Sequence, residues 1–187
     1  MGEPDWNSRY REGFNGGPGA LAPHELVTKL WPAIPKGRVV DIAMGTGRDL
    51  SFLSKKGFDV YGIEKSAEAI NIARSVLGEK AGLTRGNAEH LPLRHESVEG
   101  VLVFYFLLRS IMGDIAAILK RGGVVIYQTF LKRQNGIDRW RNPEYLLDDG
   151  ELISFFLGGF DLLFYEETVS LEHGKKRAVA KLVGRKR

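Results

Sequence analysis

A short glycine-containing segment followed by an acidic residue is the part of this sequence that most clearly suggests chemistry. Residues 38–43 (RVVDIA) form an apolar, β-branched run, Gly45 and Gly47 follow it, and a helical pattern begins at Asp49. Glycines let a backbone approach a ligand closely, and the N-terminus of a helix offers unpaired N–H groups. Glu64 ends the next apolar run, where a carboxylate can accept hydrogen bonds from ribose hydroxyls. Together these residues predict a site for an adenosine-type ligand.

Other ligand-binding patterns fit this segment less well. A dinucleotide fingerprint needs a third small residue, but Leu50 occupies that position. A P-loop needs Gly-Lys-Ser/Thr after the glycines, and the sequence has no such triplet there. The histidines are scattered without metal-ligand spacing, so we predict no metal site and expect surface or loop positions for them. These residues are His24, His90, His95 and His173.

Apolar strands alternate with helical segments along most of the chain. The predicted strands are residues 38–43, 58–63, 81–85, 99–106, 124–130, 160–171 and 177–183, and the predicted helices are residues 24–31, 49–56, 67–77, 110–120 and 151–157. This alternation is typical of βαβ units, which form a parallel sheet covered on both faces. No helix fits between the last two strands, so they should pair as an antiparallel hairpin. We therefore predict an α/β fold with an open, doubly wound, mostly parallel seven-stranded sheet and a C-terminal antiparallel hairpin.

The composition is that of an ordinary globular domain. The chain has 187 residues, of which 43% are hydrophobic and 27% are charged, and it contains no cysteine. The lack of cysteine excludes a disulfide scaffold, a thiolate nucleophile and a cysteine metal site. The sequence has no apolar run near the ~20 residues of a membrane span and no recognisable secretory signal, so we expect a cytoplasmic protein without membrane association. The net charge of +4 permits an anionic partner without requiring one.

The segment from Asp41 to Gly47 resembles the D-x-G-x-G-x-G motif of the class I S-adenosylmethionine-dependent methyltransferases, with Ala43 in place of the first glycine. Glu64 matches the acid that this family places on the ribose. Residues 86–93 (GNAEHLPL) resemble the family's stretch after the third strand, and residues 119–123 (LKRGG) resemble its turn before the fifth strand.

Two further stretches resemble the small tellurite-resistance-type branch of this family, namely residues 6–10 (WNSRY) and 141–147 (RNPEYLL). The resemblance implies a class I methyltransferase fold, S-adenosylmethionine as the cofactor and S-adenosylhomocysteine as its product. It also implies that Asn87 takes the place of an acid that receives the adenine amino group. The implied cofactor-binding residues are Asp41, Ala43, Gly45, Gly47, Glu64, Lys65, Asn87, Ala88, Phe104, Trp6, Arg9 and Tyr10.

The methyl acceptor is expected beyond the fourth and fifth strands. In-line methyl transfer from a sulfonium depends mainly on alignment, so the chemistry requires no catalytic triad. Tyr105 and Arg109 are the candidate catalytic residues, although core packing is the favoured explanation of residues 104–107. Arginines suit oxyanions, so the basic residues after the fifth strand fit a small anionic acceptor, or else a solvated loop. These basic residues are Lys132, Arg133, Arg139 and Arg141.

Residues 1–23 are predicted to form an N-terminal extension or lid, and residues 24–187 a single methyltransferase domain. Trp6, Tyr10 and Phe14 are spaced by four residues, which places them on one face of a short helix. In the lid interpretation Trp6 and Tyr10 cover the cofactor and Arg9 reaches a carboxylate. A helix that simply packs on the sheet fits the same pattern, and residues 16–19 (GGPG) are the expected hinge.

Three alternative functions remain open from the sequence. A nucleic-acid or protein methyltransferase would suit the basic tail at residues 184–187 (GRKR), although a small-molecule acceptor is favoured. A non-catalytic S-adenosylmethionine-binding module would suit Ala43 and the lack of an identifiable base. A nicotinamide oxidoreductase is the third alternative, and the sequence does not indicate an oligomeric state.

Overall fold

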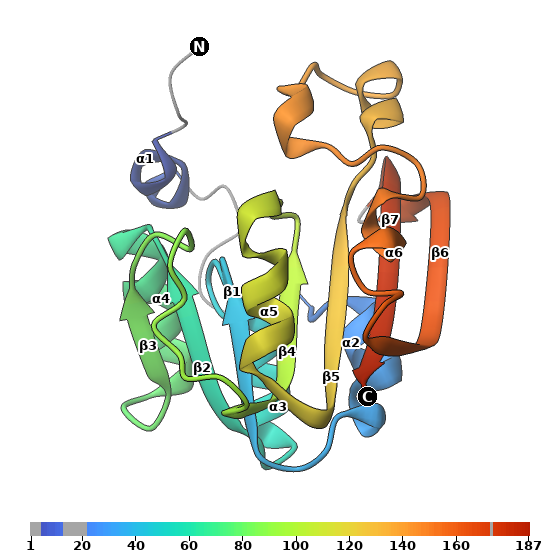
Figure 1. Cartoon of the computed structure of the whole chain (residues 1–187). Coiled ribbons are helices and arrows are strands. Elements are labelled where there is room, and N and C mark those ends of the chain that lie inside the picture. The colour runs from blue at the N-terminus through green and yellow to red at the C-terminus, as the bar shows by residue number, and fades with distance from the viewer. Residues whose placement is uncertain (1–4, 13–21, 173) are drawn as a thin grey trace.

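The computed structural model describes residues 5–12, 22–172 and 174–187 (Figure 1). Phe14, the expected hinge at residues 16–19 and His173 lie outside the described residues. In chain order the elements are α1 (Trp6–Arg11), α2 (Glu25–Leu30), η1 (Trp31–Ala33), β1 (Arg38–Ile42), α3 (Arg48–Lys55), β2 (Asp59–Glu64), α4 (Ala67–Leu77), β3 (Gly82–Arg85), β4 (Val98–Phe104), η2 (Arg109–Ile111), α5 (Met112–Ile118), β5 (Leu119–Phe130), η3 (Lys132–Gly136), η4 (Pro143–Tyr145), α6 (Glu151–Ser154), β6 (Phe160–Glu172) and β7 (Lys175–Lys186).

One seven-stranded sheet organises the molecule, with the strand order β3-β2-β1-β4-β5-β7-β6. Strands β1 to β5 pair in parallel, whereas β7 lies antiparallel between β5 and β6. This arrangement confirms the predicted α/β fold with its mostly parallel sheet and C-terminal hairpin. The strand order reverses between β1 and β4, and open α/β sheets bind ligands at such a point, beyond the carboxyl ends of the strands.

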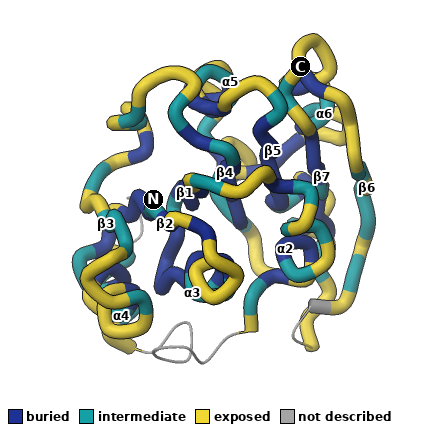
Figure 2. The backbone as a smooth tube through the Cα atoms, turned by 90° about the horizontal axis from the view of Figure 1, so that it is seen from below, coloured by how far each residue is buried: buried dark blue, intermediate teal, exposed yellow. Residues whose placement is uncertain are grey.

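Helices cover both faces of the sheet (Figure 1). Alternate residues of a strand face opposite sides, so Val39 packs with α2, α3 and α4, while Val40 packs with α5 and α6. The central strands are buried, and exposed residues gather on the outer sides of the helices and along the edge strand β6 (Figure 2). Among the helices of the described residues, none has both the length and the apolar composition needed to cross a lipid bilayer.

Three helix ends follow directly from the sequence. The Ser66 side chain accepts a hydrogen bond of 3.2 Å from the backbone N–H of Ala69 and so caps the start of α4. Gly57 and Gly78 follow α3 and α4 with φ angles of +83° and +72°, a backbone region that glycine adopts readily. The positions of α3 and α4, and with them the loops before these helices, are therefore set locally.

The helix predicted over residues 110–120 is wrong in its last part, because β5 already begins at Leu119, which pairs with Val98 of β4. The register then shifts before regular pairing resumes. Glycine is needed inside this irregular stretch, since a Cβ atom at Gly123 would lie 2.8 Å from the carbonyl oxygen of Lys120. The two glycines that seemed to end a helix thus belong to a bulge within a strand.

Candidate functional site

The loop between β1 and α3 turns tightly at the carboxyl end of β1. Ala43, Gly45 and Gly47 have φ angles of +59°, +57° and +74°, so alternate residues are left-handed. Ala43 adopts this conformation although a Cβ atom disfavours it. A Cβ atom at Gly47 would lie 3.0 Å from the Leu77 side chain and 3.2 Å from that of Ala73. Glycine at this position therefore allows α4 to pack closely against the start of α3.

Glu64, at the end of β2, holds this loop. Its Oε2 atom accepts a hydrogen bond of 2.9 Å from the Gly45 N–H, and its Oε1 atom accepts one of 2.8 Å from the Ser66 N–H. Burial raises the pKa of the Glu64 carboxyl, and the backbone hydrogen bonds oppose that rise. Each carboxylate oxygen can accept more than one hydrogen bond, so Glu64 can hold the loop and also bind a ligand hydroxyl. Its role in binding ribose stays a prediction.

Asp41 lies on β1 just before the loop, and it is buried. Burial raises the pKa of its carboxyl well above the ordinary value, and the nearby Asp49 and Glu64 carboxylates add to the rise, while Arg48 opposes it. Asp41 therefore keeps its proton to a higher pH than an exposed aspartate does. This buried group lies next to the predicted cofactor site.

Helix α1 lies beside the glycine loop and the start of α4 (Figure 1). The Asn7 Oδ1 atom accepts a hydrogen bond of 2.8 Å from the Ser66 hydroxyl, and Arg11 lies 3.3 Å from Glu68. The Tyr10 hydroxyl lies 2.9 Å from where a Cβ atom on Gly45 would stand. A larger residue at position 45 would therefore collide with Tyr10.

The other predicted residues on α1 and β2 are placed as follows. The guanidinium carbon of Arg9 lies 5.0 Å from the centroid of the Trp6 ring, and Trp6 in turn lies 6.4 Å from the Tyr10 ring. Lys65 is exposed next to Glu64, and its carbonyl oxygen accepts a hydrogen bond of 3.4 Å from Arg85. The lid function of residues 1–23 stays a prediction.

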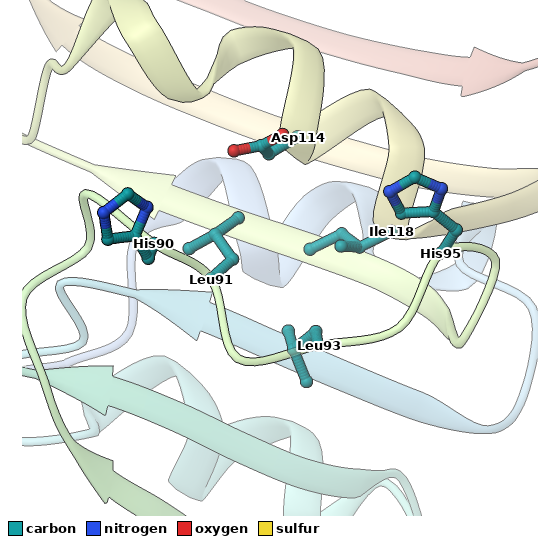
Figure 3. A pocket seen from close by; sticks show the side chains of 6 residues that line it. All are labelled: His90, Leu91, Leu93, His95, Asp114 and Ile118. Atoms are coloured by element: carbon teal, nitrogen blue, oxygen red, sulfur yellow. The ribbon is translucent and has the colours of Figure 1, made fainter.

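The segment after β3 contributes Asn87 and Ala88. Asn87 is exposed, and its Oδ1 atom accepts a hydrogen bond of 3.2 Å from the Glu89 N–H, while Ala88 is buried. The same segment and α5 line an open surface pocket of about 150 Å³ (Figure 3). Its lining residues are His90, Leu91, Leu93, His95, Asp114 and Ile118. Within the described part of the chain, no group of three or more His, Asp or Glu side chains could hold a metal ion.

Aromatic residues gather where β4 ends. Phe104 is the last residue of β4, and Tyr105 has a φ angle of +55°, so the strand stops two residues before its predicted end. The Gln128 side chain donates a hydrogen bond of 2.8 Å to the Tyr105 hydroxyl, and the Tyr105 N–H donates one of 2.8 Å to the Gln128 carbonyl oxygen. Two hydrogen bonds thus fix Tyr105 between β4 and β5.

His24 lies in a loop, directly before α2, as expected for the histidines, but it is not on the surface. It is buried, and its Nδ1 atom lies 2.6 Å from an Asp49 carboxylate oxygen. Its backbone N–H donates a hydrogen bond of 2.8 Å to the other oxygen. The ring stacks on Phe104 at 3.8 Å between centroids, and its Nε2 atom contacts Arg48. The sequence did not predict the pairing of His24 with Asp49, because the two residues lie 25 positions apart. The only signal was the position of Asp49 at the start of the predicted helix.

Arg109 and its basic neighbours contact acidic side chains of the protein. Arg109 donates two hydrogen bonds to Glu151, of 2.5 and 3.0 Å, and two more to the carbonyl oxygens of Glu144 and Leu146. This arrangement ties the loop before α6 to the end of β4, which favours a structural role for Arg109 over the predicted catalytic one. Other ion pairs here include Lys132–Asp148, Arg133–Asp149 and Arg141–Asp138, at 2.7, 3.3 and 3.1 Å.

Residues 39–123 match the family described as "Methyltransferase domain". An uncharacterized methyltransferase of Mycobacterium tuberculosis is 31% identical over 105 residues, which are 54% of this chain and 42% of that protein. The chain thus matches less than half the length of this curated relative.

Solved structures share the fold. TehB from Haemophilus influenzae superposes with a TM-score of 0.76 at 17% identity and covers 97% of this chain and 67% of its own. The putative methyltransferase described in complex with the Trm112 activator of Haloferax volcanii gives a TM-score of 0.77 at 18% identity, over 100% of this chain and 99% of the other. The family match and these folds agree with the resemblance identified in the sequence.

Proposed function

This chain has the class I S-adenosylmethionine-dependent methyltransferase fold, and from that premise we propose that it transfers a methyl group from S-adenosylmethionine to a small acceptor. The observation that carries the proposal is the pair of contacts made by Glu64, which joins the glycine loop after β1 to the end of β2. This places a carboxylate beside bare backbone at the point where the strand order reverses. Such a place suits a nucleoside with a polar tail.

The residues around the glycine loop fit this cofactor. Glu64 would hold the ribose, Gly45 and Gly47 would let the backbone approach the amino-acid part, and Asn87 and Ala88 would meet the adenine. The crowding of Gly45 by Tyr10 supports a site that α1 covers. When bound, S-adenosylmethionine supplies a methyl group that its sulfonium already activates.

The chain's own residues have to orient the acceptor and exclude water. The Phe104 ring, which stacks on the buried His24 ring, would form an apolar wall beside the loop. Gln128 fixes the direction of the Tyr105 hydroxyl, which can then hydrogen-bond to an acceptor. Holding the acceptor in line is the main source of rate in this chemistry, worth ~7–11 kcal/mol in well-oriented systems.

The basic tail gives less support to a nucleic-acid acceptor. Lys186 lies 3.7 Å from Glu96 and donates a hydrogen bond of 2.7 Å to the Leu119 carbonyl oxygen. Arg187 lies 3.8 Å from Asp161. These contacts engage both side chains within the protein, so the small-molecule acceptor remains our proposal.

Calorimetric titration of the full chain with S-adenosylhomocysteine tests the function. We expect the wild type to bind S-adenosylhomocysteine and not NAD. Glu64→Gln should weaken binding about 10- to 100-fold, because it removes charge-assisted hydrogen bonds worth about 1.5–3 kcal/mol. Glu79→Gln is the matched control, since Glu79 is exposed in the turn after α4.

Two results would contradict the proposal. If the wild type does not bind S-adenosylhomocysteine, the assignment of the cofactor site is wrong. If it binds NAD in preference, the oxidoreductase alternative is favoured. Equal affinities for the Glu64→Gln and Glu79→Gln proteins would show that Glu64 is not part of the site.

A further inference from the structure

Arg177, on β7, differs from three of the basic side chains near the carboxyl ends of β4 and β5. Lys132, Arg133 and Arg141 each have an acidic partner within 4 Å. Among the side chains that the structure describes, no carboxylate lies within that distance of the half-buried Arg177. Its guanidinium therefore lacks an anionic partner from the described protein.

The Nε atom of Arg177 is buried and has no hydrogen-bond partner among the described residues. A buried donor without an acceptor costs free energy, and a charged donor costs more than a neutral one. Native proteins satisfy nearly all such groups, so an exception calls for a missing partner such as a ligand or an ion. An oxyanion would supply both the acceptor and the opposite charge.

The backbone around Arg177 is fixed from both sides. The buried Gln134 side chain accepts a hydrogen bond of 2.6 Å from the Ala178 N–H and donates one of 3.5 Å to the Lys176 carbonyl oxygen. The Leu131 N–H also donates a hydrogen bond of 3.0 Å to the Ala178 carbonyl oxygen. Arg177 thus projects from a rigid position, as a binding residue should.

Aromatic rings connect Arg177 to the proposed cofactor site. Its guanidinium carbon lies 5.2 Å from the centroid of the Tyr105 ring and 5.5 Å from that of Phe130. The Tyr105 ring lies 5.6 Å from that of His24, which binds Asp49 at the start of α3. A continuous series of contacts through His24 and Tyr105 therefore connects the start of α3 with Arg177.

We propose that Arg177 binds an oxyanion group of the methyl acceptor, a carboxylate or a phosphate, and holds the acceptor against Tyr105 and Phe130. Arginine suits this task because its planar fork of donors matches such groups and stacks on aromatic rings. This inference rests on the proposed function and assigns the anion to a residue that the sequence analysis did not select.

The test uses the full chain saturated with S-adenosylhomocysteine and follows the ¹⁵N-labelled arginine Nε–H signals by NMR. The Arg177 signal is identified by its loss in Arg177→Gln. The probes are benzoate and inorganic phosphate, with benzamide as a neutral mimic of benzoate. We expect benzoate or phosphate to shift the Arg177 signal to saturation, and benzamide to leave it unchanged.

Two variants complete the design. Arg177→Gln should bind the same anion at least about tenfold more weakly while it keeps the wild-type affinity for S-adenosylhomocysteine, which shows that it folds. Lys132→Ala, which removes a basic side chain paired with Asp148, should bind the anion like the wild type.

The outcomes separate the two proposals. If S-adenosylhomocysteine binds but neither anion shifts the Arg177 signal, the inference is wrong and the proposed function stands. The inference is equally wrong if Arg177→Gln binds the anion as tightly as the wild type. If S-adenosylhomocysteine does not bind the wild type, the proposed function itself fails.

Discussion

At Ala43 a residue with a Cβ atom occupies a backbone conformation that favours glycine, with φ of +59°. The left-handed conformation costs such a residue roughly 1–2 kcal/mol in the folded state. Replacing it by glycine removes this strain but stabilises the unfolded chain by about 0.4–1 kcal/mol, because glycine has more conformational freedom there. We therefore expect Ala43→Gly to raise the free energy of unfolding by up to about 1 kcal/mol in urea titrations.

Gly57→Ala is the reverse control for this prediction. Gly57 also has a positive φ, of +83°, and a Cβ atom there would meet only the Lys36 Nζ atom, at 3.9 Å. Without a steric clash, the substitution should lower the free energy of unfolding by about 1 kcal/mol. If both substitutions change the free energy of unfolding in the same direction, backbone strain at these positions does not determine the change in stability.

The buried Asp41 makes stability depend on pH. Its pKa is raised in the folded protein, so the folded state binds the proton more tightly than the unfolded state does. The free energy of unfolding should therefore fall as the pH rises from the ordinary aspartate range through the raised pKa. Asp41→Asn should reduce this fall, and the part that the raised pKa of Glu64 contributes should remain; unfolding titrations from pH 4 to pH 8 would measure both.

Asp138→Asn provides a control of opposite sign. A hydrogen bond from the Arg139 backbone and one from the Arg141 side chain lower the pKa of the Asp138 carboxyl. Its stabilising effect is present above the ordinary aspartate pKa and is lost as the pH falls through the lowered value. An unchanged pH dependence in Asp41→Asn would contradict the assignment to Asp41.

Individual residues differed in how well the sequence predicted them. The placement of Glu64 beside the glycine loop could be predicted because strand, loop and helix follow one another along the chain, while the binding roles of these residues stay predictions. His24 and Arg177 were missed, since their partners lie far away in the sequence and meet them only in the folded sheet. Arg109 was selected because arginine suits oxyanions, but in the fold it pairs with Glu151, 42 positions away, which favours a structural role.

At the scale of elements, α1 is the part whose role is most directly testable. Its contacts with α4 and the glycine loop place Arg9 and Arg11 beside the proposed cofactor site. If α1 is a lid, S-adenosylhomocysteine should slow trypsin cleavage after both arginines several-fold. Cleavage after the exposed Lys80, in the turn before β3, should not change.

Asn7→Ala is the matching variant, because it removes the acceptor of the Ser66 hydroxyl hydrogen bond. It should speed cleavage in α1 and reduce the protection. Unchanged cleavage in α1 at concentrations that saturate the protein would argue for a helix that merely packs on the fold.

Element boundaries were less predictable than element types. Alternation of apolar strands with helices was enough to predict the mostly parallel sheet and its hairpin. The end of β4 and the start of β5 were misplaced, because a left-handed Tyr105 and a bulge at Gly123 depend on contacts between the strands. Local patterns cannot report such contacts.

At the scale of the whole molecule, ligand binding should stabilise the fold by mass action. S-adenosylhomocysteine at 100 times its Kd would add about 2.7 kcal/mol to the free energy of unfolding. For a chain of this size that corresponds to a rise of about 5–10 °C in Tm. Thermal unfolding followed by circular dichroism would measure it.

At the same ligand concentration, Glu64→Gln should show a smaller rise in Tm. A rise with NAD but none with S-adenosylhomocysteine would contradict the cofactor assignment. The affinities from calorimetry and the shifts in Tm have to agree, which makes this measurement an independent check.

In our proposal, the methyl donor and the acceptor are bound by residues on different sides of the boundary between β1 and β4. Residues assigned to the methyl donor come mainly from the first half of the chain, whereas Tyr105, Phe130 and Arg177, which hold the acceptor in our proposal, come from the second half. Grafting a different C-terminal hairpin and its preceding loop would then redirect the protein to a new substrate while donor recognition is inherited intact. Such chimeras offer a practical route to tailored methylation catalysts.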